Sequence, residues 1–313
     1  MAWKKLGLIY SLPASPERST THMQGPVAIL LEDRFRIFFA ARNAAGKSYA
    51  ARLDVSAADP TVRLDLDERP LLPPATDGAF DDDGVMPACA VRHDNALWLY
   101  YSGWNRRVTV PYHNTTGLAT SLDDGLSFER PYPGPLLDRT PTEPWMAVTP
   151  WVLFDQGHWK MWYVSGLGWL DVEGHKEPVY TLKYAVSPDG VHWQRDGLEF
   201  LPRRHAAEAI ARPCVILRDG LYHLWYSYRD SREFRDGKGS YRIGYAQSRD
   251  GLTWQRADAL SGIDLSPDGW DSKMICYPYV VVTGERLYLF YNGNGFGQTG
   301  IGCAVWEGAL PVL

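Results

Sequence analysis

The chain has 313 residues, of which 45% are hydrophobic and 22% are charged, and its formal net charge is −5. These values are typical of a folded globular protein, and the small acidic excess argues against a nucleic-acid partner or an acidic membrane surface. No apolar run approaches the roughly 18 residues that a membrane-spanning helix needs. The 13 tryptophans and 18 tyrosines, beside 29 glycines and 22 prolines, favour strands and turns over helices.

Segment 1–10 contains Lys4 and Lys5 but neither a long apolar stretch nor a small-residue cleavage site. It is therefore unlike a secretion signal, and we expect a cytoplasmic protein. The cysteines show no Cys-x-x-Cys spacing and no nearby histidines at zinc-binding intervals, which indicates buried free thiols in a reducing compartment. These cysteines are Cys89, Cys214, Cys276 and Cys303.

One pattern then repeats five times along the chain. Each copy has an apolar run around a proline, a short polar turn and an aromatic run, as in VMPACAV followed by ALWLYYSGW. The anchoring prolines are Pro26, Pro87, Pro150, Pro213 and Pro278, which are 61 to 65 residues apart. Self-similarity at a fixed period indicates a repeat architecture built from one supersecondary unit.

A third element follows the aromatic run in most copies, for example TGLATS and YRIGYAQS. Three of these elements lead into Asp-Gly turns, which are hairpin signals between neighbouring strands. The turns contain Asp124-Gly125, Asp189-Gly190 and Asp250-Gly251. Each unit is therefore predicted to be a four-stranded antiparallel sheet.

Radial repetition of such sheets makes a β-propeller. We predict an all-β fold, a single five-bladed β-propeller domain over residues 1–313. The last unit ends too early to hold a fourth strand, while segment 3–10 precedes the first unit and has no blade of its own. We therefore expect this N-terminal strand to close the last blade, which would remove two exposed sheet edges.

In such a blade, the loop before the first strand and the loop after the second strand share one face of the propeller. These loops are long and carry acids, guanidinium groups, amides and indole rings, as binding loops do. Aromatic rings stack on the C–H face of a sugar, while acids and amides bond its hydroxyl groups. We expect a small-molecule or oligosaccharide substrate at this face, with no nucleic-acid or membrane partner.

The candidate residues on these loops fall into two groups. We predict Asp83 and Glu208 as a catalytic acid/base pair, with Asp271 or His22 assisting. Histidine is a suitable base because its pKa lies near neutrality. The predicted substrate-binding residues are Arg42, Asp82, Trp104, Tyr112, Arg212, Arg229 and Asn294.

The five units, the prolines of the inner strands and turns such as SPDGVHW and SRDGLTW resemble the five-bladed propeller glycosidases. These include the arabinanase/xylosidase, invertase/levansucrase and mannoside-phosphorylase families. The resemblance extends over nearly the whole chain and implies a carbohydrate-active enzyme. In the phosphorylase branch it implies an arginine cluster that holds phosphate, a role open to Arg42, Arg212 and Arg229.

The chain departs from this family at the catalytic positions. Arabinanase-like members place acids directly before the first-strand proline of blades one and three, and one or two residues before that of blade four. This sequence has Gly25, Thr149 and Ala211-Arg212 there. The predicted acids lie a few residues upstream of the prolines instead.

Three classes of function therefore stay open. The first is a glycoside hydrolase or phosphorylase acting on a small glycoside or oligosaccharide. The second is a non-hydrolytic enzyme, an isomerase, lyase or cyclase, acting on a sugar-like or natural-product intermediate. The third is a non-catalytic sugar-binding propeller. We expect no cofactor and no structural zinc, and a Ca²⁺ ion held by clustered aspartates in the central channel is the one metal considered.

Overall fold

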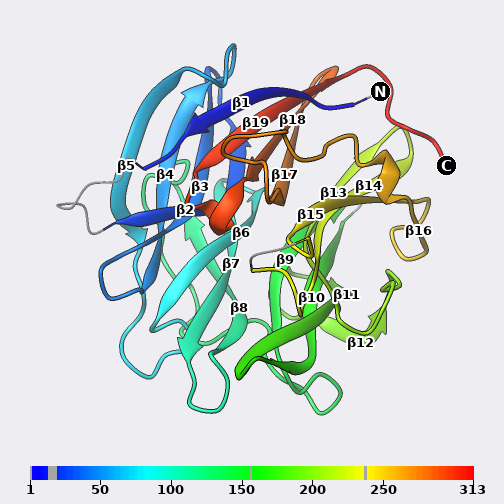
Figure 1. Cartoon of the computed structure of the whole chain (residues 1–313). Helices are drawn as coiled ribbons and strands as arrows, with labels where there is room; N and C mark the ends of the chain where they lie inside the picture. Colours follow the sequence, from blue (N-terminus) through cyan, green and yellow to red (C-terminus); the bar gives the residue numbers. More distant parts are fainter. Residues whose placement is uncertain (1, 13–19, 156, 236–237) are drawn as a thin grey trace.

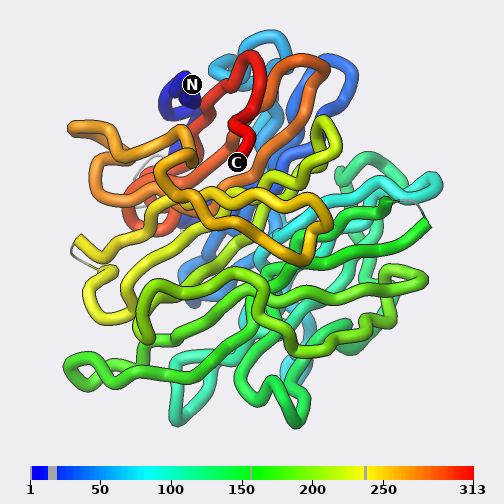
Figure 2. The backbone as a smooth tube through the Cα atoms, turned by 90° about the vertical axis from the view of Figure 1, so that its right-hand side faces the viewer, coloured from blue at the N-terminus to red at the C-terminus, as the bar shows by residue number. Residues whose placement is uncertain are grey.

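The computed structural model describes residues 2–12, 20–155, 157–235 and 238–313. Nineteen strands account for almost all regular structure in these residues, and the helical elements among them are two 3-10 turns, η1 (Asp258–Leu260) and η2 (Asn294–Gly297). Figure 1 shows the strands gathered into sheets, with β1 at the N-terminus lying beside β19 near the C-terminus. Figure 2, turned by 90°, likewise shows the two chain ends near one another.

The strands divide into five antiparallel blades numbered in chain order. Blade 1 contains β2 (Thr21–Leu30), β3 (Arg34–Arg42), β4 (Ser48–Ser56) and β5 (Arg63–Leu72). Blade 2 contains β6 (Gly84–His93), β7 (Ala96–Arg106) and β8 (Tyr112–Ser121). Blade 3 contains β9 (Ala147–Asp155), β10 (His158–Val172), β11 (His175–Ser187) and β12 (Gln194–Glu199). Blade 4 contains β13 (Glu208–Arg218), β14 (Leu221–Asp230), β15 (Arg242–Ser248) and β16 (Trp254–Arg256). Blade 5 contains β17 (Cys276–Thr283), β18 (Arg286–Asn292), β19 (Ile301–Glu307) and β1 (Lys4–Tyr10).

Blade 2 differs from the others at its outer edge. Two isolated bridges, from Leu137 to Thr116 and from Glu129 to Thr120, stand where the fourth strand was predicted. A single parallel bridge between Ser48 and Gly84 joins blade 1 to blade 2, so these two blades form one seven-stranded sheet. The predicted all-β propeller with four-stranded antiparallel blades is otherwise confirmed.

The N-terminal strand closes the fifth blade, as the sequence predicted. Strand β1 pairs antiparallel with β19, from Lys4 opposite Val305 to Tyr10 opposite Ile301. Beside it, the buried Trp3 ring makes edge contacts with Trp225 of blade 4 and Trp306 of blade 5, at centroid distances of 5.6 and 5.5 Å. The first residues of the chain therefore join the last two blades.

Neighbouring blades meet through the predicted Asp-Gly turns. The Tyr100 hydroxyl donates to the Gly190 carbonyl of the next blade at 2.9 Å, and the Trp162 indole donates to Gly251 at the same distance. A Cβ added at Gly125 would lie 2.2 Å from the Phe38 ring, so these turns require glycine for close approach as well as for positive φ. The central aromatic of one blade thus packs on the hairpin of the next.

A β-bulge interrupts the first strand of four blades at the residue before its proline. In blades 1, 3, 4 and 5 the strand pairing skips the pre-proline residue and the proline together. These pre-proline residues are Gly25, Thr149, Arg212 and Tyr277, with φ of 67°, 51°, 53° and 58°. Left-handed backbone is rare for residues other than glycine and marks local strain, which is often found at functional sites.

Blades 2 to 5 each bury an acid that lies before the first strand or at its first residue, and a tyrosine, a cation or both bind this acid. We call this group the blade latch. Its acids are Asp81, Glu143, Glu208 and Asp271, all 2% exposed or less. In blade 2, Asp81 accepts from Tyr101 at 2.9 Å and pairs with Arg130 at 2.7 Å. In blade 5, Asp271 accepts from Tyr291 at 2.9 Å and from Lys5 of β1 at 2.7 Å.

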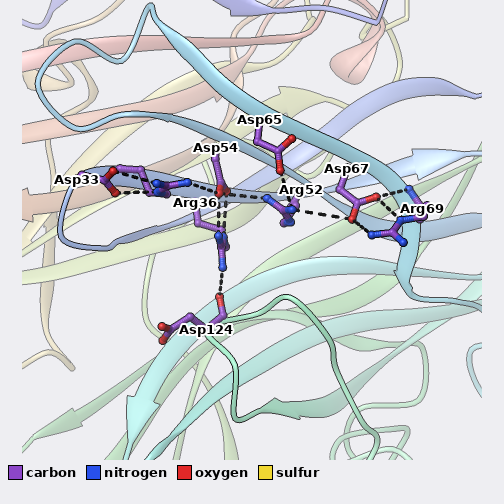
Figure 3. A network of polar contacts seen from close by, with 9 residues as sticks. Asp33, Arg36, Arg52, Asp54, Asp65, Asp67, Arg69 and Asp124 are labelled. Atoms are coloured by element: carbon purple, nitrogen blue, oxygen red, sulfur yellow. Dashed lines mark hydrogen bonds and ion pairs between the residues drawn. The ribbon is translucent and has the colours of Figure 1, made fainter.

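Blade 1 has an ion-pair network on its outer strands (Figure 3). The buried Asp54 carboxylate pairs with Arg36 at 2.7 Å and with Arg52 at 3.1 Å. Arg36 also donates to the Asp124 carbonyl of blade 2 at 3.0 Å. Arg52 continues the network to Asp65 at 2.8 Å, so blade 1 is tied to blade 2 by charge as well as by the bridge at Ser48.

The four cysteines are buried free thiols. The residues that the structure describes include no helix with the length and apolar character of a membrane span.

Candidate functional site

A cavity of about 400 Å³ takes lining residues from all five blades. It receives the residues before the first-strand prolines of every blade, namely Gly25, Met86, Thr149, Arg212 and Tyr277. In blades 1, 3 and 4 these are positions at or next to which the resemblance places acids. None of the five residues has a carboxylate.

Arg212 and Gly25 fit one another across this site. Arg212 is 3% exposed and donates to the backbone carbonyls of Pro87 at 2.7 Å and of Gly25 and Pro26 at 3.0 Å. A Cβ at Gly25 would lie 3.2 Å from its guanidinium group. Because glycine leaves this space open, the Arg212 guanidinium sits beside the position expected to hold the base aspartate.

No carboxylate of the described residues lies within ion-pair distance of Arg212. Its guanidinium group is hydrogen-bonded to backbone carbonyls, which bring no formal negative charge, and burial lowers its pKa from the usual value. A buried cation without a counter-ion is costly unless something else supplies negative charge.

Arg42 and Arg229 are joined to the cavity through polar and aromatic groups. Arg42 donates to the Gln24 side-chain oxygen at 3.0 Å, and the Gln24 amide donates to the Tyr277 hydroxyl at 3.2 Å. Arg229 donates to the Tyr180 hydroxyl at 3.2 Å and lies 3.6 Å over the Phe234 ring.

The tyrosine hydroxyl groups make the cavity wall strongly polar on one side. The Tyr180 and Tyr241 hydroxyls hydrogen-bond to one another, and the Tyr241 and Tyr277 rings are 5.7 Å apart. Burial raises the pKa of Tyr112, Tyr241 and Tyr277, so these hydroxyls stay protonated at neutral pH and can donate to a ligand.

Glu177 of β11 is the one carboxylate among the described residues that line the cavity. It is 3% exposed and accepts two hydrogen bonds from Arg235, at 2.6 and 3.1 Å. This bidentate pair neutralises both groups, which leaves Arg42, Arg212 and Arg229 as the uncompensated charges of the wall.

His22, at the start of β2, has a left-handed backbone with φ of 64° and lines the cavity. Burial, and then the charge of Arg42, lower the pKa of its imidazole to about 4. The ring is therefore neutral at physiological pH and can accept a proton. Its Nδ1 lies 2.9 Å from the Thr21 hydroxyl.

Of the predicted substrate-binding residues, Arg42, Trp104, Tyr112, Arg212 and Arg229 line the cavity with His22. Trp104 is fixed there by a 2.8 Å hydrogen bond from its indole to the Ser48 hydroxyl. The propeller thus brings together six residues that the sequence placed on five different loops.

The structure places the predicted acids away from this cavity. Asp83 accepts from the Arg106 backbone N–H at 2.7 Å, and Asp82 accepts from that of Gly78 at 2.8 Å. Glu208 and Asp271 belong to the blade latches of blades 4 and 5. Glu208 accepts from Arg256 at 2.7 Å, and although burial alone would raise its pKa, that hydrogen bond and the charge of Arg256 leave it lowered.

Asn294, in η2, serves the backbone of its own region. Its side-chain oxygen accepts from the backbone N–H of Lys273 and Met274 at 2.8 and 3.0 Å. None of Asp82, Asp83, Glu208, Asp271 and Asn294 lines the cavity described above. Their predicted catalytic and binding roles stay predictions.

Sequence reasoning did not find Glu177, Tyr180, Tyr241 and Tyr277 as site residues. Tyr277 could have been found, because it stands at the pre-proline position that the resemblance marks in other blades. Glu177 and Tyr180 lie on β11, whose pairing with β10 continues past a register shift to the hairpin at His175. The sequence gives no sign of this long hairpin.

Metal ligands do not cluster in the part of the chain that the structure describes: no group of three or more His, Cys, Asp or Glu side chains there could hold an ion.

Comparison with known proteins agrees with this geometry. No family model matches the chain. Uncharacterized protein MT1551 of Mycobacterium tuberculosis (strain CDC 1551 / Oshkosh) is 40% identical over 309 residues, which cover 98% of this chain and 100% of that protein. A thermostable family-43 glycoside hydrolase has a TM-score of 0.68 at 17% identity, covering 96% of this chain and 93% of that chain.

A second solved structure comes from the GH130 family, described as mannoside phosphorylases that include glycoside hydrolases for β-1,2-mannosidic linkages in Candida mannan. It has a TM-score of 0.68 at 14% identity, covering 99% of this chain and 96% of that chain. These likenesses confirm the predicted fold of the propeller glycosidases.

Proposed function

The chain belongs to the family of the Mycobacterium tuberculosis protein MT1551, and on that premise we propose that it is a carbohydrate-active enzyme. Its substrate is a small glycoside or oligosaccharide that binds in the cavity shared by the five blades. The observation that carries this proposal is that the pre-proline residues of all five blades line one cavity, and the resemblance places catalytic acids at or next to these positions in blades 1, 3 and 4. Fold alone does not set the reaction, so the reaction is argued from the residues of that cavity.

His22 is the proton acceptor in this proposal. Its ring lines the cavity, and its pKa of about 4 keeps the imidazole unprotonated at neutral pH. A base of this kind takes a proton from a water molecule, a phosphate or a sugar hydroxyl as that group reacts. Trp104 and Tyr112 provide aromatic faces for the sugar, and the Tyr277 hydroxyl is a hydrogen-bond donor beside it.

The number of carboxylates favours a second candidate, a non-hydrolytic isomerase, lyase or cyclase acting on a sugar-like intermediate. Glycoside hydrolysis ordinarily uses two carboxyl groups on either side of the scissile bond. Glu177 is the single carboxylate among the described cavity residues, and Arg235 holds both of its oxygens. A reaction that needs one base and bound hydroxyl groups fits this cavity without a second acid.

We propose a cytoplasmic location from the state of the cysteine thiols. All four cysteines are buried and free, which suits the reducing cytoplasm.

The test is turnover on aryl furanosides, aryl pyranosides and short oligosaccharides, with and without phosphate, followed by mass spectrometry. Hydrolysis adds water to the products, phosphorolysis adds phosphate, and isomerisation leaves the mass unchanged. We expect turnover that falls by at least 100-fold in His22→Gln, the loss typical of a missing general base. The matched control is His175→Gln, at an exposed hairpin outside the cavity. Binding without turnover on any substrate would identify a sugar-binding propeller instead.

A further inference from the structure

We propose that the sugar substrate carries its own negatively charged oxyanion, a carboxylate or a phosphate, and that Arg42, Arg212 and Arg229 form its binding site. This inference rests on the proposed function for the sugar itself. It adds the chemical class of the substrate, an anionic sugar rather than a neutral one.

The balance of charge in the cavity is the first argument. Four arginines line it and one carboxylate, Glu177, faces them. That carboxylate is occupied by Arg235, the most exposed of the four, whose side chain is 61% exposed. Arg42, Arg212 and Arg229 have no ion pair within 4.0 Å among the described residues, although Arg212 and Arg229 are each only 3% exposed.

Unfilled hydrogen-bonding capacity is the second argument. The buried Nη1 of Arg229 and the buried Nε of Arg42 have no partner in the structure. Buried donors are almost always satisfied in folded proteins, so two residues that line the cavity keep unfilled hydrogen-bonding capacity in their guanidinium groups. A carboxylate or phosphate has several acceptor oxygens, and guanidinium groups bind both with paired hydrogen bonds.

Hydrogen bonds and ring contacts around Tyr277 connect the surroundings of the three guanidinium groups. The chain Arg42–Gln24–Tyr277 is hydrogen-bonded, and Gly25, the residue after Gln24, accepts from Arg212. On the other side, Tyr277 packs against Tyr241, whose hydroxyl meets that of Tyr180 beside Arg229. Electrostatic contact with Tyr277 affects the pKa of both Arg42 and Arg212, as expected for groups that share one wall.

A neutral sugar would leave this wall uncompensated. Its hydroxyls accept hydrogen bonds, but they bring no charge to oppose three buried or half-buried cations. An oxyanion provides both acceptor oxygens and negative charge, in a cavity where burial strengthens electrostatic attraction relative to water. The wall also contains the protonated Tyr277 hydroxyl, a further donor for an anionic oxygen.

The test is isothermal titration calorimetry with matched sugars at low ionic strength. Glucose, galactose and mannose are each titrated as the neutral sugar, the uronate and the 6-phosphate, beside inorganic phosphate alone. We expect at least one anionic form to bind 10-fold or more tightly than its neutral parent. Whether the uronate or the phosphate has the advantage then identifies the oxyanion.

Arg229→Gln and Arg42→Gln are expected to reduce this advantage by at least 5-fold. Arg69→Gln, at an exposed position of β5, is the matched control and is expected to leave the affinity advantage of the anionic sugar unchanged. Gly25→Asp is a second kind of variant, because it places a carboxylate beside Arg212 and removes no guanidinium group. It is expected to abolish the preference for the anion, provided that its thermal melting shows a folded protein.

Equal binding of neutral and anionic sugars in all three series would overturn the inference. So would an advantage that survives in both arginine variants, or inorganic phosphate that binds as tightly as the sugar phosphates. Turnover of neutral glycosides without any anionic preference would leave the proposed enzyme intact and reject this inference. A preference for anionic sugars without turnover of any substrate would support this inference and reject the proposed enzyme.

Discussion

At the scale of single residues, the cavity is built from strained backbone. Thr149, Arg212, Tyr277 and His22 all have positive φ, and all four line the cavity. Left-handed backbone at a residue other than glycine costs on the order of 1–3 kcal/mol. The surrounding ladders hold these residues in place, so the orientation of each side chain is fixed before a ligand arrives.

Replacement of Thr149 by glycine is expected to be tolerated in spite of its central position. Glycine adopts φ near 51° without the clash that a β-branched residue suffers, which offsets the lost side-chain contacts. We expect the free energy of unfolding to change by less than about 1 kcal/mol. The neighbouring Val148→Gly, buried on the same strand, should lose about 2 kcal/mol or more. Urea denaturation measures the free energy of unfolding of both variants. A greater loss of stability in Thr149→Gly than in Val148→Gly would show that the backbone at Thr149 is not strained.

The ring of His22 is expected to titrate near pH 4. Burial is the larger cause of its lowered pKa and the charge of Arg42 is the smaller one. In Arg42→Gln the midpoint should therefore rise toward the usual 6.5 but not reach it. NMR titration of the histidine ring signals measures this directly. A His22 midpoint near 6.5 in the native protein would show that neither burial nor Arg42 shifts the pKa of this imidazole.

Two histidines, the half-buried His22 and the buried His223, make stability depend on pH. The pKa of His22 and of His223 is about 4 in the folded protein, against 6.5 for an exposed ring, with burial the largest cause of both shifts. As the pH falls from about 6.5 toward 4, the unfolded chain takes up protons that the folded chain does not. The free energy of unfolding should therefore decrease across this window, by less in His223→Gln than in the wild type. The exposed His158→Gln should behave as the wild type, and an unchanged slope in His223→Gln would contradict the prediction.

At the scale of elements, the blade latch accounts for acids that the sequence presented as catalytic. Glu208 has a suitable position in the chain, a few residues before a first-strand proline, and only the structure reveals its bond to Arg256. Acids of this kind fix the loop before the first strand against the outer strand of the same blade. We propose a structural role for Glu208 and Asp271.

Glu208→Gln tests this role against the catalytic one. Removing the charge breaks the buried pair with Arg256 and leaves Asp258, at 2.9 Å, as the carboxylate partner of that guanidinium, so the expected cost is about 1–3 kcal/mol of stability. Activity measured well below the melting temperature should stay within a few-fold of the wild type. Asp83→Asn, whose side chain is 15% exposed, is the control and should lose less stability. Activity that collapses in a folded Glu208→Gln protein would restore its catalytic assignment.

The elements themselves were largely predictable, for physical reasons. A propeller needs the same strand pairing in every blade, so its prolines, aromatic runs and Asp-Gly turns recur at a fixed spacing. The resemblance to the propeller glycosidases marked Gly25, Thr149 and Ala211-Arg212, and the structure shows a β-bulge at the pre-proline residue of blades 1, 3, 4 and 5. Glu177 and Tyr180 were not predictable, because they enter the cavity from a hairpin whose length no repeat specifies. Neither was the outer edge of blade 2, where bridges stand in place of a strand.

At the scale of the whole molecule, closure depends on the two ends of the chain. Strand β1 covers the edge of β19, and Lys5 provides the cation for the latch acid Asp271. Trp3 adds contacts to blades 4 and 5 together. Contacts between residues separated by almost the full length of the chain therefore close the ring of blades.

Deletion of residues 2–10 is expected to open the ring. The truncated chain loses the β1 ladder, the buried Trp3 ring and the Lys5 cation that pairs with Asp271. The stability that these contacts contribute together exceeds several kcal/mol. The melting temperature should fall by about 10 °C or more, since each kcal/mol shifts it by roughly 2–4 °C in proteins of 150–250 residues. Lys4→Ala, at an exposed position of the same strand, is the control. Calorimetry that finds the truncated protein within 2 °C of the wild type would show that β1 is dispensable.

The residues before the first-strand prolines have a further consequence for how such a protein changes over time. Each blade offers one such position to the shared cavity, and none of the five takes part in the latches. Three of their side chains also contact another blade: Arg212 donates to carbonyls of blades 1 and 2, the Tyr277 hydroxyl accepts from Gln24, and the Thr149 hydroxyl bonds to that of Ser102. Exchange of an aspartate for glycine at position 25 and of a glutamate for arginine at position 212 would convert an acidic cavity wall into a basic one. A library randomised at these five codons would therefore sample new cavity chemistry together with new contacts between blades, while the strands, hairpins and latches stay unchanged.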